Sequence, residues 1–478
     1  MLVPSHGAPP RSRRWLILAT CSMSVLLVSL DITIVNVALP RIAHDLRTGV
    51  AGLQWIVDAY TLVISTLLIF GGSMADRYGR RRVFQIGLAV FALGSLLCSL
   101  APTLGLLVVF RAVQAVGGSM MNPVAISIIR NTFEDPHERA RALGIWGATV
   151  GISLALGPVA GGALVSGVGW RSIFWVSVPI ALLALGLTTR IVPESRAEHP
   201  RPFDLAGQAL VMVMLAALTY AIIEGNSLGW TSPPELALFA VVIVAFGVLI
   251  PLESRRAQPL LELRFFHSRP FTGANVIALA TFAGVSGYLF LNTLYLQVAR
   301  HLSPFEAGLH VLPIAAMALV FAPLSGHLVA RRGSRPPLLL AGVCLTASPA
   351  MLIGINAGTS ITLLTASYIL FGIGFGLVNT PISATAVGGM PPAQAGVAAA
   401  IASSARQTGG TLGVAITGAM IAGSAIHGTP SGLDDSGWWF VAGCGVLVLL
   451  VGVASTTRRA LASASAAFSA RDAAAAEA

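Results

Sequence analysis

Three ionisable side chains lie inside long apolar stretches of the sequence: Asp31, Asp58 and Arg111. A charge inside a membrane-spanning helix costs on the order of 2.5–3.5 kcal/mol, so such residues indicate a path for protons or ions. Asp31 and Arg111 each lie about seven residues from the same end of their stretches, which places both roughly 10 Å deep in a helix. A carboxylate and a guanidinium at one depth can exchange an ion pair for a bound proton. We therefore expect Asp31 to be the main proton carrier and Arg111 to move toward or away from it.

Plainer interpretations of the same residues remain open. A permanently charged Asp31–Arg111 pair could serve only the packing of two helices, since buried ion pairs often fix geometry. Asp58, about four residues into its own stretch, is either a second carboxylate that takes protons or cationic compounds, or a residue near the lipid headgroups.

The composition requires a membrane for these stretches. The 478-residue chain is 55% hydrophobic and 10% charged, whereas charged residues make up about 25% of a soluble protein. All 29 basic residues are arginine, so the chain lacks the lysine that a P-loop ATPase or Schiff-base chemistry needs. The four cysteines stand alone and the nine histidines are scattered, which predicts neither a disulfide framework nor a metal site. We expect neither an enzyme nor a nucleic-acid-binding protein.

Fourteen apolar runs are long enough for helices that cross a bilayer, which needs about 20 residues each. The sequence thus predicts an all-α polytopic membrane protein. The runs cover approximately 15–39, 54–74, 83–100, 104–128, 142–164, 172–191, 205–223, 235–252, 271–298, 306–330, 337–355, 360–382, 397–422 and 438–455.

The arginines indicate the orientation of these runs. An even number of spans places both termini on one side, and most arginines fall in the segments of that side. Arg41, Arg47, Arg171 and Arg300 fall on the other side, and Arg111 and Arg406 fall inside helical runs. Because arginine is enriched in cytoplasmic loops, both termini are expected in the cytoplasm.

A loop pattern repeats within the chain. Residues 72–81 (GSMADRYGRR) and residues 326–335 (GHLVARRGSR) share the order Gly, aliphatic, Arg, Gly, Arg, with Asp76 replaced by Ala330. The offset of about 254 residues predicts two six-helix halves whose site lies between them. The expected division is a cytoplasmic N-terminus (1–14), a first bundle (15–191), a linker with two additional helices (192–270), a second bundle (271–456) and a cytoplasmic tail (457–478).

Several motifs resemble the major facilitator superfamily over essentially the whole chain. The loop 72–82 is similar to its motif A, 107–117 to its motif B, with Ala115 in place of a glycine, and 157–162 to its motif C, which marks antiporters, with Ser153 in place of an earlier glycine. Segments 30–40 and 169–175 are similar to signatures of the fourteen-helix drug:proton antiporter branch. The resemblance implies the major facilitator fold, two six-helix bundles plus two extra central helices.

The resemblance also implies roles for particular residues. Motif A is expected to act as a gating loop, in addition to fixing topology and contacting lipid, through Gly72, Asp76, Arg77, Gly79, Arg80 and Arg81. Gly157, Pro158, Gly161 and Gly162 form the antiporter motif, where glycine and proline allow bending and close helix approach; simple small-residue packing is the alternative. The substrate cavity is expected to include Asn36, Gln114, Tyr288, Asn292, Tyr295, Phe371, Phe375 and Asn379, although any one of them could instead pack against its neighbours.

These features together predict a proton-coupled antiporter of the plasma membrane that exports drugs, antibiotics or other amphipathic small molecules by alternating access. The proton gradient would supply the energy, with no cofactor and no metal, and the partners would be the substrate, protons and membrane lipids around a monomer. The alternative is a dedicated transporter of one metabolite, such as a siderophore, lipid, sugar or natural product, by export or symport.

Overall fold

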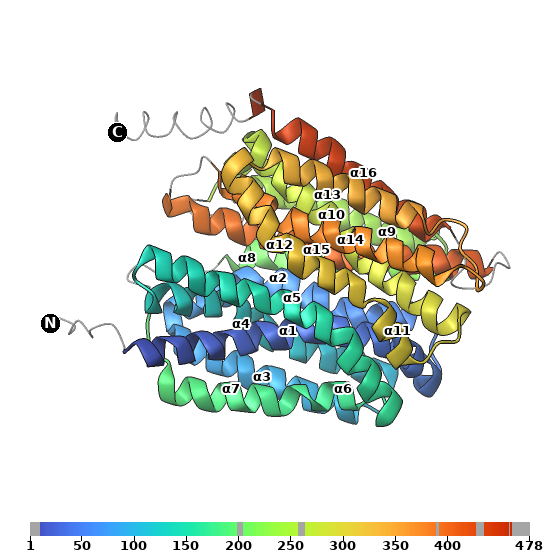
Figure 1. Cartoon of the computed structure of the whole chain (residues 1–478), viewed down its shortest axis with the longest axis horizontal. Coiled ribbons are helices and arrows are strands. Elements are labelled where there is room, and N and C mark those ends of the chain that lie inside the picture. The colour runs from blue at the N-terminus through green and yellow to red at the C-terminus, as the bar shows by residue number, and fades with distance from the viewer. Residues whose placement is uncertain are drawn as a thin grey trace.

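A computed structural model describes residues 10–197, 204–256, 263–388, 392–426, 435–457 and 459–460. Every regular element in these ranges is helical (Figure 1). The predicted cytoplasmic tail lies almost entirely outside the described residues, as does most of the predicted N-terminal segment. We call the side on which the first helix begins and the last helix ends the terminal side, and the other the opposite side.

The first half of the chain forms one bundle, in the blue to green part of Figure 1. Its helices are α1 (Arg11–Leu46), α2 (Val50–Tyr78), α3 (Arg80–Leu100), α4 (Leu104–Thr132), α5 (Pro136–Gly167), α6 (Ser172–Trp175) and α7 (Ser177–Ile191). Two helices then lie between the halves in sequence, α8 (Leu205–Leu228) and α9 (Pro233–Ser254).

The second half forms the other bundle. Its helices are α10 (Arg269–Leu294), α11 (Pro304–His310), α12 (Leu312–Arg332), α13 (Arg335–Ala350), α14 (Ile361–Val387), α15 (Pro392–Ile426) and α16 (Ser436–Ser455), with short turns η1 (Leu263–His267) and η2 (Tyr295–Ala299). The repeated loop has the same geometry in both halves. Gly79 ends α2 with φ +110° and Gly333 ends α12 with φ +76°, a backbone region that favours glycine.

Each of the fourteen predicted runs overlaps a helix or a pair of consecutive helices. The sixth run is divided at Val176 and the tenth at Val311. Twelve of the described segments are long and apolar enough to cross a membrane. The 16-residue helix α13 is shorter than such a segment needs to be, and α15 is not among the twelve. The structure therefore confirms a multi-pass helical protein but not the count of fourteen spans.

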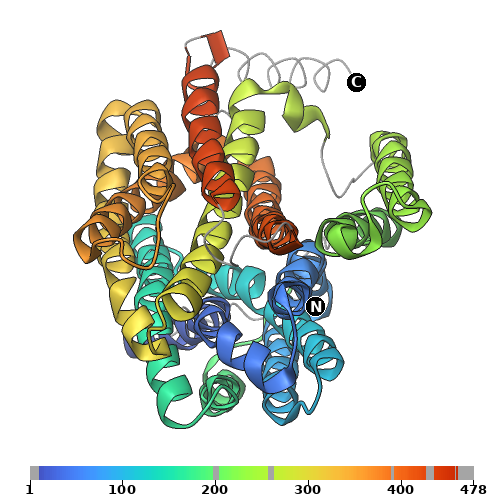
Figure 2. The same ribbon diagram turned by 90° about the vertical axis from the view of Figure 1, so that its right-hand side faces the viewer.

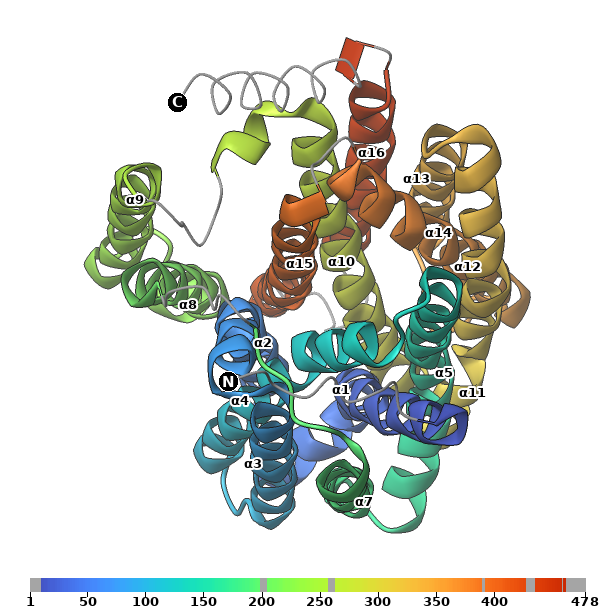
Figure 3. The same ribbon diagram turned by 90° about the vertical axis from the view of Figure 1, so that its left-hand side faces the viewer.

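The two additional helices stand beside the bundles, as Figures 2 and 3 show. Helix α8 packs against α2 of the first half and α15 of the second. The Trp55 indole donates to Glu224 Oε1 at 3.0 Å, and Asn226 donates to the Ala419 carbonyl at 2.6 Å. Helix α8 thus bridges the seam between the halves. Helix α9 exposes large apolar side chains, such as Ile243 at 70%, as expected for a helix that faces lipid.

The halves share one large cluster of buried apolar side chains, and this cluster lies on the opposite side. It includes Leu39, Trp170, Leu294 and Trp438. Glycines permit the close approach of α5 and α11, because a Cβ on Gly162 would lie 2.5 Å from the Pro304 carbonyl oxygen. The other large clusters stay within the first half or within the second half. The space between the halves is therefore closed on the opposite side.

Candidate functional site

The structure brings Asp31 of α1 and Arg111 of α4 into an ion pair in the interior of the first half, with both side chains 1% exposed. The Gln114 amide joins this pair: its oxygen accepts from Arg111 at 2.7 Å, and its nitrogen donates to Asp31 Oδ1 at 2.8 Å. The same nitrogen donates to Ser95 Oγ of α3 at 2.8 Å. We call Asp31, Ser95, Arg111 and Gln114 the ion-pair cluster. Both carboxylate oxygens of Asp31 thus accept hydrogen bonds from neighbouring side chains, as a buried charge requires.

The surroundings of the cluster explain its burial. The Arg111 guanidinium lies 4.1 Å from the centroid of the Tyr60 ring and donates through Nε to the Ile56 carbonyl at 3.1 Å. Helices α3 and α4 approach closely because Gly94 faces the backbone of Gln114. A Cβ on Gly94 would lie only 2.5 Å from the Cα of Gln114. Arg111 and Gln114 are three residues apart and share one helix face.

Two members of this region were not expected from the sequence, Ser95 and Tyr60. A serine or tyrosine in an apolar run carries no local signal that distinguishes a cluster member from a packing residue. Gln114 was expected in the substrate cavity, but it is fully buried in the ion-pair cluster. The three-residue spacing from Arg111 is the signal that could have placed it there.

Asp58 lies apart from the ion-pair cluster. It is fully buried on α2, next to Thr61, whose hydroxyl donates to Asp58 Oδ1 at 3.5 Å. Thr61 in turn accepts a hydrogen bond of 2.9 Å from Thr411 of α15. Asp58 Oδ2 makes no hydrogen bond to a described residue. Asp58 is therefore an uncompensated carboxylate near the contact between the halves, and the proposed location among headgroups does not fit this burial.

The motif A loop is bound to its own half in this conformation. Arg80 forms an ion pair with Asp76 at 2.9 Å, and Arg81 donates through its guanidinium to the Thr189 carbonyl at 2.5 Å. Glu194, which follows α7, accepts from the Arg81 backbone amide at 3.1 Å and packs against Gly79. Glu194 was not expected from the sequence, because its partner lies 113 residues away. Arg77 is exposed and Gly72 lies near Pro123.

The four residues of the antiporter motif pack against both halves. A Cβ on Gly157 would meet Thr33 Oγ1 at 1.9 Å, and one on Gly161 would meet the Ile34 side chain at 2.6 Å. Gly162 faces α11, and the Pro158 carbonyl lies against Gly308 of the same helix. Helix α5 continues through Pro158. The small residues therefore let α5 contact α1 and the second half together.

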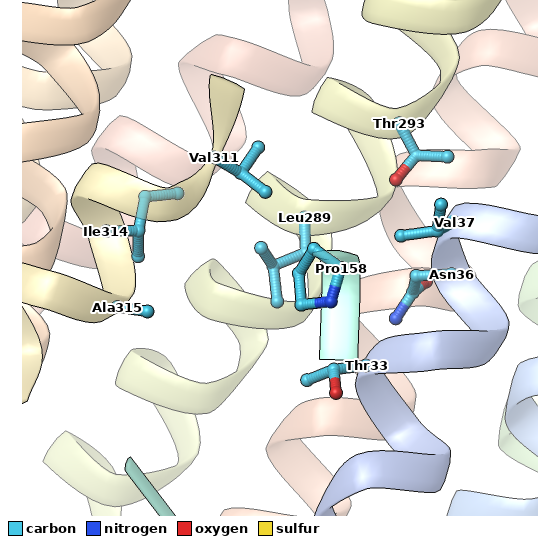
Figure 4. A pocket seen from close by; sticks show the side chains of 9 residues that line it. All are labelled: Thr33, Asn36, Val37, Pro158, Leu289, Thr293, Val311, Ile314 and Ala315. Atoms are coloured by element: carbon cyan, nitrogen blue, oxygen red, sulfur yellow. The ribbon is translucent and has the colours of Figure 1, made fainter. Parts of the chain in front are cut away.

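A cavity lies between the halves next to this motif (Figure 4). Its volume is about 30 Å³, so the cavity is small in this conformation. Its polar lining is Thr33, Asn36 and Thr293, and Asn36 Oδ1 is buried without a hydrogen-bond partner among the described residues. The full lining is Thr33, Asn36, Val37, Pro158, Leu289, Thr293, Val311, Ile314 and Ala315. Asn36 is thus the expected cavity residue that the structure places there.

The expected cavity residues of the second half pack inside their own bundle in this conformation. Tyr288 is fully buried, hydrogen-bonds Ser367 at 2.7 Å and stacks on Phe371 with 3.8 Å between the ring centroids. Asn292 accepts from the Tyr368 hydroxyl at 2.7 Å, and Tyr295 donates to the Asn356 carbonyl at 2.8 Å. Aromatic rings that stack and find hydroxyl partners satisfy themselves without a ligand. These four residues therefore do not line the space between the halves.

Phe375 and Asn379 differ from these four because they are partly exposed. Phe375 contacts Phe282 of α10 edge to face at 5.9 Å, and Asn379 donates to the Phe375 carbonyl at 3.2 Å. The described residues contain no group of three His, Cys, Asp or Glu side chains that could hold a metal ion.

The sequence of the chain is similar to a family profile and to several known proteins. The profile of the Major Facilitator Superfamily matches residues 21–414. The chain is 37% identical over 407 residues to the multidrug resistance protein Stp of Mycobacterium tuberculosis, which covers 85% of this chain and 76% of that protein. It is 35% identical to the tetracenomycin C resistance and export protein of Streptomyces glaucescens, covering 88% of this chain and 78% of that protein. It is 30% identical to the riboflavin transporter RibZ of Clostridioides difficile, covering 86% and 89%.

Solved structures show the same fold at low sequence identity. The D-xylose–proton symporter aligns with a TM-score of 0.66 and 15% identity, over 92% of this chain and 97% of that one. The nucleoside transporter NupG aligns with a TM-score of 0.64 and 13% identity, over 92% and 100%.

Proposed function

The chain belongs to the Major Facilitator Superfamily, and from this premise we propose that it exports drugs, antibiotics or similar amphipathic small molecules by alternating access. The chain is a transporter of small molecules and not an enzyme, because the members of this family are transporters. Relatives that carry the names of multidrug and antibiotic resistance and export proteins support the direction and the substrate class. The observation that carries the proposal is the buried Asp31–Arg111 pair, together with a cavity between the halves to which the helix of Asp31 also contributes.

In this proposal the protein lies in the plasma membrane with both termini in the cytoplasm. The arginine-rich segments on the terminal side favour that orientation, because positive residues are retained on the cytoplasmic side. The opening between the halves would then face the cytoplasm, where an exporter loads its substrate. The protein would act as a monomer, with the two bundles, the linker with α8 and α9, and the tail as its units.

Protons would drive the cycle through the ion-pair cluster, without a cofactor. A proton on Asp31 would remove the charge that holds Arg111, while Gln114 and the Ile56 carbonyl still accept hydrogen bonds from the guanidinium. Arg111 could then move without losing every partner, which keeps the cost of the step low. Since α1 carries Asp31 and also Thr33 and Asn36 of the cavity, a shift of α1 would couple proton binding to the substrate site. One proton that crosses about 150 mV supplies roughly 3.5 kcal/mol.

The motif A loop would gate the terminal side. Its arginines now bind Asp76 and the segment around Glu194 within the first half. We propose that the closed state of this side requires the loop to exchange some of these contacts for contacts with the second half.

The second candidate is a dedicated transporter of one metabolite, and the similarity to a riboflavin transporter favours it. Transport assays in inverted vesicles separate the two candidates. With an imposed pH gradient, we expect uptake of several unrelated amphipathic compounds, and loss of uptake when an uncoupler is added. Uptake of one compound from a broad panel would favour the dedicated transporter. Uptake that is insensitive to the uncoupler would refute proton coupling.

A further inference from the structure

Arg406 of α15 is a cation that forms no ion pair with any described residue. Its guanidinium donates to Ser383 Oγ at 2.7 Å, and its Nε is buried without a hydrogen-bond partner among the described residues. In the described part of the second half (263–388, 392–426 and 435–457), the carboxylates are Glu306 and Asp435. Both lie on the opposite side and are engaged by the Ser303 and Gly354 backbone amides. A lone guanidinium within a bundle is costly, so its retention calls for an anionic partner.

One face of α10 lies along the space between the halves, and we call it the cleft face. Its partly exposed positions recur at helical spacing, while the other positions of the helix are buried against its neighbours. Leu289 and Thr293 of this face line the cavity together with Thr33 and Asn36 of the first half. The partly exposed positions are Thr272, Val276, Leu279, Phe282, Ser286 and Leu289, and the buried Thr293 continues the same face at the end of the helix.

Arg406 borders this face from α15. A Cβ on Gly410 would lie 3.3 Å from Ser286 Oγ, and Arg406 is one turn from Gly410 on the same side of α15. From α14, Phe375 contacts Phe282 of the cleft face, and Asn379 and Ser383 follow it at intervals of four residues. Ser383 is exposed and lies one turn before the terminal-side end of α14. Figure 3, viewed from the terminal side, shows α10 between α14 and α15 of its own half, and α15 next to α2 of the first half.

Arg406, Ser383 and Asn379 therefore lie beside the cleft face. The same face reaches the cavity at Leu289 and Thr293. We propose that Arg406, with Ser383 and Asn379, binds the acidic group of a substrate, such as a carboxylate, when the protein is open to the terminal side. The aromatic pair Phe282–Phe375 would receive the apolar part of the same molecule. A guanidinium suits this role because its fixed fork of donors matches a carboxylate. The inference deepens the proposed export function, on which its physiological meaning rests.

A binding experiment tests the site independently of transport. The purified full-length protein in a phospholipid-free detergent is titrated with a diethylaminocoumarin carboxylic acid and with the methyl ester of the same dye, and dye anisotropy gives each dissociation constant. We expect the wild-type protein to bind the acid about tenfold or more tightly than the ester, because a hydrogen bond to a charged group has roughly this effect on affinity. Equal affinity for both dyes, or tighter binding of the ester, would overturn the proposal.

Variants connect the preference to Arg406. Arg406→Gln should abolish the preference for the acid while affinity for the ester changes less than about twofold. Arg406→Lys should keep only part of the preference, because it retains the charge but loses the fork of donors. Arg300→Gln, which removes an arginine on the opposite side that donates to the Thr359 carbonyl, is the matched control and should leave both affinities unchanged. If Arg406→Gln weakens both dyes equally, or leaves the preference intact, Arg406 has a packing role and the proposal fails.

Two further measurements distinguish the proposed site from a lipid-binding site and from the proposed export function. Anionic phospholipid added to the detergent should compete weakly with the acid, whereas full displacement would assign the guanidinium to a lipid headgroup and overturn the substrate site. Export of the two dyes into inverted vesicles is measured separately. Selective acid binding without export would leave the site standing and refute the proposed function.

Discussion

The two halves fill equivalent places in their bundles with different chemistry. In the first half, the first, third and fourth helices contribute the ion-pair cluster, with Asp31 on α1, Ser95 on α3 and Arg111 on α4. In the second half, the corresponding helices α10, α13 and α14 contribute Tyr288, Ser348 and Ser367, which hydrogen-bond one another. We call these three residues the hydroxyl cluster.

The difference indicates a division of labour. A buried ion pair has two states, because a proton can replace the attraction between its members. The hydroxyl cluster has no charge to gain or lose near neutral pH and is satisfied internally by bonds of 2.7–3.2 Å. In the proposed mechanism the first half would therefore respond to protons, whereas the interior of the second half would stay constant. Substitutions in the two clusters should therefore differ in kind.

The largest effect is expected for Asp31→Asn. The change leaves Arg111 buried without a counter-charge, and breaking one member of a buried pair costs about 3–5 kcal/mol. Export driven by a pH gradient in inverted vesicles should fall to the level seen with an uncoupler, and the thermal unfolding midpoint should drop. Asp45→Asn, at a partly exposed carboxylate on the opposite side, is the control and should retain export within about twofold. Unimpaired pH-driven export by Asp31→Asn would remove Asp31 as the proton carrier.

A smaller but clear effect is expected for Gln114→Leu. The side chain keeps its approximate volume but loses its bonds to Asp31, Ser95 and Arg111. Buried polar groups left unpaired cost about 1–3 kcal/mol, so export should fall about tenfold and stability should decrease in the same variant. Wild-type export together with wild-type stability would show that the amide takes no part in the cluster.

The hydroxyl cluster should tolerate Tyr288→Phe much better. The ring can still stack on Phe371, and Ser348 and Ser367 can still bond each other at 2.9 Å. We expect a loss of about 1 kcal/mol in the free energy of unfolding, typical of one hydrogen bond, and export within about twofold of wild type. A tenfold loss of export in a variant that remains folded would break the comparison, because the second cluster would then take part in coupling.

The smallest effect is expected for Ser348→Ala. Tyr288 keeps its bond to Ser367, so no ring is left without a partner. The free energy of unfolding should fall by about 0.5 kcal/mol, the lower end of the range for a single hydrogen bond, and the pH dependence of export should coincide with that of wild type. A displaced pH profile in this variant would contradict the constant role of the second half.

Much of the architecture was predictable because the relevant signals are local. Apolar runs of sufficient length must be helices in a bilayer, since the backbone has no other partners there, and the repeated glycine of the motif A loop predicts the same turn at Gly79 and Gly333. The depth of Asp31 and Arg111 follows from the rise of a helix, so their pairing could be anticipated. The burial of Asp58, the partners of Gln114 and the contact between Glu194 and the gating loop could not.

The sequence by itself determined a multi-pass helical protein of two related halves, the resemblance to its family and the pairing of two charges at one depth. Only the tertiary structure decided which polar residues face the cavity and which face a neighbouring helix. In a membrane helix nearly every face is apolar, so periodicity does not report the rotation of the helix about its axis. Tyr288 could therefore have faced either the cavity or the bundle interior, and the packing of α10 against α13 and α14 made it an interior residue. The same packing left Arg406 next to the cleft face without a carboxylate partner in the part of the chain that the structure describes.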